Sequence, residues 1–68
     1  MSRTETYSVV GMTCDHCARS VSAEVGSLPG VTEVHVDLPS GLVTVTSEGL
    51  DTAQVRGAVE EAGYTLAP

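Results

Sequence analysis

The stretch VHVDLPSGLVTVT, residues 34–46, predicts a β-hairpin in the middle of the chain. Its first half alternates valine and leucine with polar residues, which is the period-two pattern of a strand covered on one face only. The Pro-Ser-Gly sequence at residues 39–41 supplies the turn. The strand that returns over residues 42–46 is expected to place Val43 and Val45 inward.

An amphipathic helix is expected on each side of this hairpin. Before it, apolar residues recur at helical spacing from Cys17 to Leu28, and the Pro-Gly pair at residues 29–30 ends the pattern. After it, Asp51 is expected to cap a second helix with Gln54 as its capping-box partner. The predicted buried stripe of the second helix consists of Val55, Ala58, Val59 and Ala62.

A strand at each end completes the order of elements. Residues 4–10 are rich in Thr, Tyr and Val and stop at Gly11, whereas residues 64–67, after the helix stop at Gly63, form only a short edge strand. The order predicts an α+β fold, the ferredoxin-like βαββαβ sandwich, in which two helices cover one face of a four-stranded antiparallel sheet. Right-handed crossovers then bring four residues to one end of the domain: Cys14, Cys17, Ser40 and Tyr64.

Size and charge exclude several classes of function. The 68 residues form one domain, residues 1–68, with too small a core for an enclosed active site, so an enzyme is not expected. Nine acidic residues against three basic ones give a net charge of −6, which disfavours nucleic acid and anionic membrane surfaces as partners. The chain lacks an apolar run long enough to span a bilayer and lacks a signal peptide, so a cytoplasmic location with reduced thiols is expected.

The sequence MTCDHC, residues 12–17, places two thiols one helical turn apart directly after a strand. Thiolate sulfur selects soft ions, and two such ligands favour Cu(I), since a structural zinc site needs four. Cys17 is expected in the first helical turn, where free backbone N–H groups stabilise the thiolate. Cys14, on the loop before the helix, is expected to be the more exposed ligand.

Three other readings of the two cysteines compete with a copper site. Thioredoxin-like redox chemistry also uses Cys-x-x-Cys at a helix start, but it needs a longer chain, and no Trp flanks the motif. A structural zinc site would need His16 or a second molecule to complete four ligands. An inert buried thiol is compatible with Cys17 but not with Cys14, which follows a polar residue on a loop.

Residues 11–18, GMTCDHCA, resemble the metal-binding signature of heavy-metal-associated domains, and the resemblance extends over essentially the whole chain. It is closest to the small soluble copper chaperones of bacteria, which share the histidine before the second cysteine and a Gly-Tyr pair after the second helix. The resemblance implies that Cys14 and Cys17 bind Cu(I). It also implies transfer by ligand exchange to the metal-binding domain of a copper-transporting P-type ATPase, with a copper-responsive repressor as a second candidate partner.

The resemblance also suggests roles for the neighbours of the cysteines. Met12 packs beneath the loop, and Thr13 stands where zinc- and cadmium-transporting relatives carry Asp. His16 is either an exposed modulator or an extra ligand in a copper-bridged homodimer of an otherwise monomeric protein. Tyr64 is either a core aromatic residue or a mark of bacterial chaperones, and with Met12, Thr13 and His16 it is a candidate auxiliary residue of the metal site.

Two questions stay open at this point. Mercury-binding relatives share the Met-Thr-Cys sequence of residues 12–14, so Hg(II) is a second candidate metal. The alternative to a free carrier is the N-terminal metal-binding domain of a heavy-metal transport ATPase, or a mercury-binding protein. A chain that runs from Met1 to Pro68 without a linker favours the carrier.

Overall fold

Four strands form one sheet in the order β2-β3-β1-β4, and two helices pack against it. The computed structural model describes residues 2–67, so Met1 and Pro68 of the predicted domain lie outside the described residues. The elements in chain order are β1 (Arg3–Val10), α1 (Asp15–Gly26), β2 (Val31–Asp37), β3 (Leu42–Ser47), α2 (Thr52–Glu61) and β4 (Thr65–Leu66).

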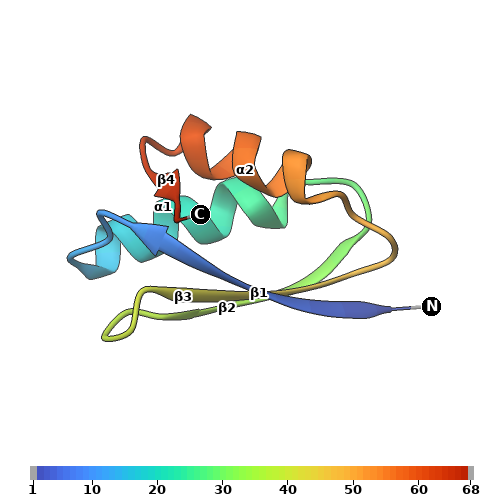
Figure 1. Ribbon diagram of the computed structural model, residues 1–68, viewed down its shortest axis with the longest axis horizontal. Coiled ribbons are helices and arrows are strands. Elements are labelled where there is room, and N and C mark those ends of the chain that lie inside the picture. The colour runs from blue at the N-terminus through green and yellow to red at the C-terminus, as the bar shows by residue number, and fades with distance from the viewer. Residues whose placement is uncertain (1, 68) are drawn as a thin grey trace.

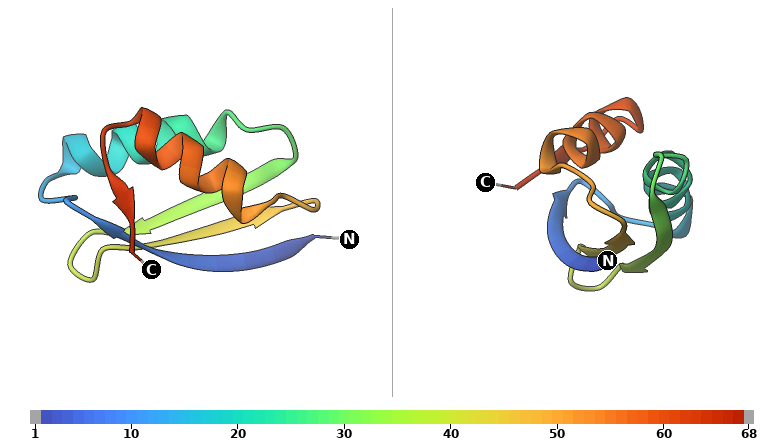
Figure 2. Two further views of the ribbon diagram at one scale, coloured as in Figure 1. Left: turned by 45° about the horizontal axis from the view of Figure 1, so that its top comes forward. Right: turned by 90° about the vertical axis from the view of Figure 1, so that its right-hand side faces the viewer.

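All strand pairs are antiparallel, and both helices lie on the same face of the sheet (Figure 1). The long central strand β1 pairs with β3 along most of its length, whereas the two-residue strand β4 pairs only with Val9 and Val10. Figure 2 shows the two helices side by side above the sheet. The predicted ferredoxin-like βαββαβ fold is confirmed, including the short edge strand at the C-terminus.

The core between the helices and the sheet is built mainly from valine, with Met12, Ala58 and Leu66. The largest fully buried side chains come from α1, β3 and α2, and they are Val21, Val25, Val43, Val45, Val55 and Val59. The predictions for the hairpin and for the second helix are therefore confirmed, except that Ala62 is only half-buried. Because the sequence has no Trp or Phe, aliphatic burial supplies nearly all of the hydrophobic stabilisation.

Helix α2 has the expected signals at both ends. The backbone N–H of Asp51 donates to Oε1 of Gln54 at 3.2 Å, which is the back-bond of a capping box. At the other end, Gly63 takes a positive φ of 95°, and the N–H of Tyr64 donates to the carbonyl of Val59 at 3.0 Å. This Schellman-type ending fixes the backbone direction of Tyr64.

Helix α1 is shorter at its C-terminus than the sequence pattern indicates. It ends at Gly26, because Ser27 caps it with a side-chain bond to the carbonyl of Glu24 at 2.8 Å. Leu28, which the pattern placed in the helix, lies in the following turn and still packs against the core. The prediction that the helix reaches Leu28 was therefore wrong, because an apolar residue can reach the core from a turn as well as from a helix.

The outer face of the sheet, away from the helices, is lined with threonine. The hydroxyls of Thr4 and Thr46 lie 3.3 Å apart, and those of Thr6 and Thr44 lie 3.4 Å apart across the β1–β3 pair. His35, on β2, is exposed. Neither helix of the described residues is long and apolar enough to cross a membrane.

Candidate metal centre

The two cysteines lie where the loop after β1 enters α1. Cys14 is the N-cap residue of α1 with an extended backbone (φ −155°, ψ 171°), and Cys17 lies in the first helical turn. Their sulfur atoms are 3.4 Å apart, and both are free thiols. Cys14 is exposed and Cys17 is half-buried, as the sequence predicted.

The loop is anchored by Met12 and presents its other side chains to solvent. Met12 is only 8% exposed and belongs to the core cluster, which agrees with the packing role that the resemblance implies. Thr13, Asp15 and His16 are exposed. The loop therefore has a fixed base and an accessible rim that carries Cys14.

Tyr64 approaches this loop from the far end of the chain. Its side chain is half-buried and lies within hydrogen-bonding reach of Cys17, whose pKa it lowers. The ring also packs against the core cluster, as expected of a core aromatic residue. The turn of the β2–β3 hairpin lies at the same end of the molecule as the cysteine loop (Figure 1), as the crossovers predicted.

The surroundings of Cys17 stabilise its thiolate. The pKa of Cys17 is lowered from its ordinary value of 9.0 to about 6. The largest cause is the hydrogen bond from the Tyr64 side chain, followed by hydrogen bonds from the backbone of Thr13 and the thiol of Cys14, against a partial opposing effect of burial. The same contact raises the pKa of Tyr64. Cys17 is therefore largely a thiolate at neutral pH, the form that binds metal.

This result extends one physical argument made from the sequence. The backbone at the start of α1 was expected to stabilise the thiolate. Backbone groups of Thr13 and Cys14 do contribute to the lowered pKa of Cys17, but the Tyr64 side chain contributes most. Tyr64 was expected as an auxiliary residue of the site without a stated role, because nothing in the local spacing of residues 12–17 indicates which distant side chain will reach the loop.

Two sulfurs are the whole donor set that this part of the chain offers. Within residues 2–67, no group of three or more His, Cys, Asp or Glu side chains is placed to hold a metal ion. His16 and Asp15 flank the thiols in sequence but do not complete such a group. A four-ligand zinc site is therefore not assembled by residues 2–67 alone, whereas a soft ion that accepts two ligands fits the donor set.

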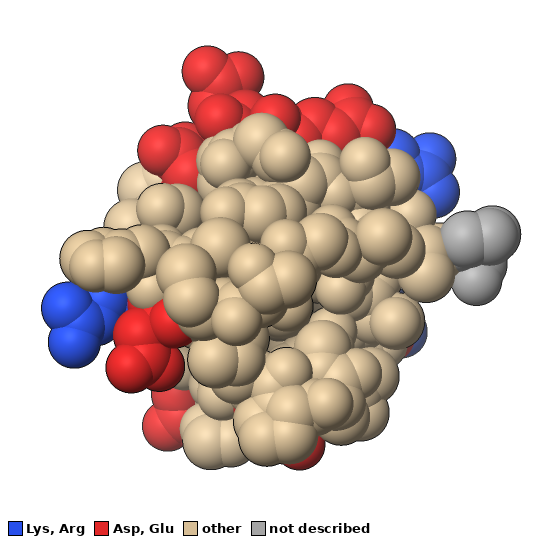
Figure 3. Space-filling model, turned by 90° about the vertical axis from the view of Figure 1, so that its left-hand side faces the viewer, with Lys and Arg blue, Asp and Glu red and all other residues tan. Residues whose placement is uncertain are grey.

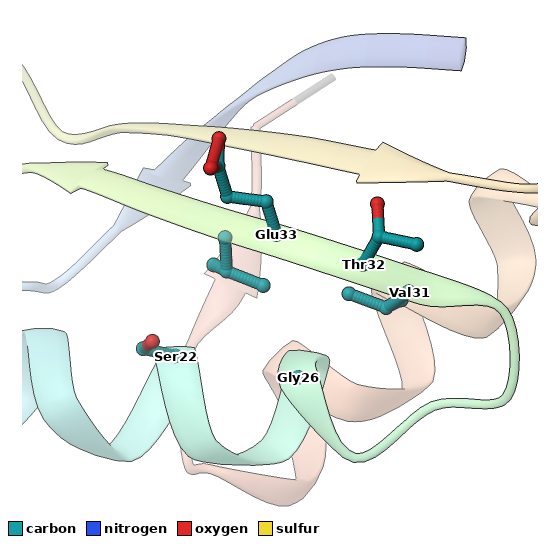
Figure 4. Close-up of a pocket in the computed structure, with 6 residues that line it drawn as sticks. Ser22, Gly26, Val31, Thr32 and Glu33 are labelled. Atoms are coloured by element: carbon teal, nitrogen blue, oxygen red, sulfur yellow. The ribbon is translucent and has the colours of Figure 1, made fainter. Parts of the chain in front are cut away.

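Two surface depressions lie along α1, and neither is lined by a cysteine. One, of about 200 Å³, opens between α1 and β2 and is lined by Ser22 and Gly26 on the α1 side and by residues 31–34 of β2 on the other (Figure 4). The other, of about 280 Å³, lies nearer the start of α1 and is lined by Asp15, Ala18, Arg19, Ser22 and Val36.

Figure 3 shows the end of the molecule that carries the cysteine loop. Its centre is free of charged side chains, and acidic side chains gather on its upper rim. Glu60 and Glu61, the last residues of α2, are exposed, and α2 ends at this end of the molecule (Figure 1). Basic side chains also lie at the edge of the face in Figure 3, so this face is uncharged in the middle and carries charges of both signs, mostly negative, at its edge.

Comparison with known proteins gives a consistent result. Residues 6–65 match the family described as "Heavy-metal-associated domain". The "Copper chaperone CopZ" of Bacillus subtilis (strain 168) is 38% identical over 65 residues, covering 93% of this chain and 94% of that protein. A solved structure titled "CopZ metallochaperone" superposes with a TM-score of 0.91 at 31% identity, covering 96% of this chain and 100% of the other. A copper binding domain from HMA7, a P-type ATPase, superposes with a TM-score of 0.89 at 27% identity, covering 96% and 90%.

Proposed function

This chain belongs to the heavy-metal-associated domain family, and we propose that it is a carrier that binds Cu(I) through Cys14 and Cys17. The observation that carries the proposal is the pair of free thiols 3.4 Å apart on an exposed loop, with one of them held as a thiolate. Cu(I) is a soft ion, which thiolate ligands select, and within residues 2–67 the two thiols are not joined by a third His, Cys, Asp or Glu placed to hold a metal.

Binding requires a small movement of the exposed cysteine. Two metal–sulfur bonds in a straight line, at about the 2.3 Å of zinc–thiolate bonds, need sulfurs roughly 4.6 Å apart. The observed separation is 3.4 Å, so Cys14, which is exposed, rotates outward while Cys17 stays beside Tyr64. The cargo is then held between one fixed and one adjustable ligand.

We propose that copper leaves by ligand exchange to the metal-binding domain of a copper-transporting P-type ATPase. An incoming thiolate attacks the two-coordinate ion and forms a three-sulfur intermediate, in the manner of thiol–disulfide exchange. Cys14 remains bound at first contact. Cys17 leaves in the second step as a thiolate that its hydrogen bonds stabilise. Copper keeps its oxidation state, and each sulfur that leaves the ion is replaced by a sulfur of the acceptor. A copper-responsive repressor is a second candidate acceptor.

A second candidate function is supported by the similarity to the P-type ATPase domain. In that case the domain would receive copper and dock inside a transporter rather than carry copper to it. The two functions differ in the partner that accepts or delivers the ion. Two transfer experiments distinguish these functions. One measures transfer of Cu(I) from this protein to an isolated ATPase metal-binding domain, and the other measures transfer from a chaperone to this protein. In both cases the two cysteines bind the ion and pass it on without catalysing a reaction. The location that we propose for the protein is the cytoplasm.

The binding experiment is a competition between the protein and a colorimetric Cu(I) chelator, combined with X-ray absorption. We expect one Cu(I) per chain with two to three short copper–sulfur contacts. Cys14→Ser and Cys17→Ser should each weaken binding by orders of magnitude while circular dichroism stays unchanged. A preference for four-coordinate Zn(II) over Cu(I) would contradict the proposal.

Light scattering in the presence of copper tests the role of His16. His16→Ala is compared with His35→Ala, since both histidines are exposed but only His16 lies in the loop region. If His16 is an extra ligand in a copper-bridged homodimer, its replacement lowers the mass observed by light scattering in the presence of copper, and His35→Ala does not. Equal behaviour of the two variants leaves His16 as a solvent-exposed neighbour without a ligand role.

A further inference from the structure

Gly11 and Tyr64 are in close contact at the point where β1 ends. Gly11 has a φ of 98°, a conformation that other residues rarely adopt. A Cβ placed on Gly11 would lie 3.3 Å from Cδ1 and 3.9 Å from Cε1 of the Tyr64 ring. A side chain at position 11 would therefore be in tight contact with the ring edge, which would have to move away by a few tenths of an ångström.

Two separate constraints determine where the Tyr64 hydroxyl lies. The backbone of Tyr64 is fixed by the end of α2, through its N–H bond to the carbonyl of Val59 at 3.0 Å. The ring then lies against the bare backbone of Gly11, and the Tyr64 side chain lies within hydrogen-bonding reach of Cys17. Of the two constraints, the contact at Gly11 comes from the residue that follows β1 and leads into the cysteine loop.

We propose that Gly11 is a positioning residue for the copper site: the absence of a side chain at this position allows the Tyr64 ring to lie over the start of the loop, so that its hydroxyl reaches the sulfur of Cys17. Gly11 contacts neither the metal nor a thiol in this role and acts only through Tyr64. The inference rests on the proposed function in one respect, the use of Cu(I) affinity as a readout.

A matched control is available in the same chain. Gly49 has a φ of 94°, almost the same as Gly11, but a Cβ at Gly49 would meet nothing within 4 Å. Replacing either glycine with alanine therefore introduces the same kind of backbone strain. Only Gly11→Ala also pushes against the Tyr64 ring. The difference between the two variants isolates the contact from the strain.

The first measurement uses the apo protein and does not depend on copper. In the wild type, NMR should show cross-relaxation between the Tyr64 ring protons and the α-protons of Gly11. In Gly11→Ala the ring resonances of Tyr64 should move, whereas those of Tyr7 should stay in place. In Gly49→Ala the Tyr64 resonances should be unchanged. Unchanged Tyr64 resonances in Gly11→Ala would overturn the proposal.

The second measurement is a double-mutant cycle on Cu(I) affinity at pH 7. Gly11→Ala should weaken binding about tenfold relative to Gly49→Ala, the size expected of one hydrogen bond to a charged group. Tyr64→Phe should produce a similar loss, and Gly11→Ala added to Tyr64→Phe should produce no further loss. An equal effect of Gly11→Ala in both backgrounds would mean that it acts on the loop directly, which overturns the proposal. If the wild type itself binds no Cu(I), the proposed function fails, and the NMR comparison still decides the positioning role.

Discussion

The side chain of Tyr64, three residues beyond the end of α2, lies within hydrogen-bonding reach of Cys17 and stabilises the thiolate at the start of α1. This contact is the largest single cause of the low pKa of Cys17. The other thiol, Cys14, is exposed. The two ligands of the proposed site are therefore not equivalent, although they come from one short loop.

Replacing Tyr64 with Phe removes this hydroxyl while keeping the ring. We expect the pKa of Cys17 to rise from about 6 toward its ordinary value of 9.0. The pH profile of thiol alkylation, followed for each cysteine by mass spectrometry, measures this change. Tyr7→Phe is the control. Tyr7 packs against the core, and it is not among the groups that shift the pKa of Cys17. A Cys17 profile that is the same in Tyr64→Phe and in the wild type would contradict the assignment.

The low pKa of Cys17 also makes the stability of the apo protein depend on pH. The thiol titrates near 6 in the folded protein and near 9.0 when unfolded, so the folded state binds fewer protons in this window. Stability from this group is complete above about 9 and is lost as the pH falls through about 6. We expect the urea midpoint to rise between these values, with a smaller rise in Cys17→Ser. Equal slopes in the two proteins would show that Cys17 does not cause the dependence.

Thr13 tests metal selectivity. Thr13→Asp adds an exposed carboxylate next to Cys14 and supplies the hard oxygen ligand that the chain lacks at this position. We expect a gain in Zn(II) affinity with little change for Cu(I). Parallel titrations of the two proteins with both metals measure it, and Thr13→Asn controls for size without charge. An unchanged zinc constant would mean that Thr13 does not discriminate between the metals.

The valine core predicts a clear contrast between two substitutions. Val59 is fully buried, whereas Val10 is 57% exposed. Val59→Ala should lower the free energy of unfolding by about 2 kcal/mol through lost burial and a cavity. Val10→Ala should change it by less than about 0.5 kcal/mol. Denaturant unfolding of the apo proteins measures both, and similar losses would contradict the burial pattern.

The negative charge of the chain should affect how fast it meets its acceptor. A net charge of −6, with acidic side chains at the rim of the cysteine face, favours a partner with a basic patch. Stopped-flow transfer to an ATPase metal-binding domain should therefore slow as salt is added. Glu60→Gln with Glu61→Gln should reduce this salt dependence, and Glu5→Gln with Glu48→Gln provides a control pair of the same charge. A transfer rate that does not change with ionic strength would contradict electrostatic steering but not the ligand-exchange mechanism.

The sequence was sufficient for most of the fold because its signals are local. The alternation around residues 34–46, the Asp51–Gln54 pair and the Gly63 stop each specify one element, and each is present as predicted. The end of α1 was harder, because an apolar residue at Leu28 fits the helical spacing and the turn equally well. Local patterns do not distinguish two backbone paths that bury the same side chain.

The site was predictable only in part for the same reason. The spacing of Cys14 and Cys17 gave their relative exposure and their place at the helix start. The bond from Tyr64 and the contact of its ring with Gly11 depend on how the end of α2 lies over the loop. Such a tertiary relationship has no signal in either segment alone. The sequence does contain a glycine before the motif and the Gly63-Tyr64 pair. Neither feature indicates that the two segments are in contact.

The burial of Met12 determines the order in which an oxidant would damage the loop. Three sulfur atoms lie within six residues, but Met12 is 8% exposed while Cys14 is open to solvent and Cys17 is a reactive thiolate. Peroxide therefore meets the thiols first, and their early products are reversible by cellular reductants. The thioether is converted to a polar sulfoxide only after the core opens. The loop thus exposes its thiols to an oxidant and shields the thioether, whose oxidation would place a polar group in the core.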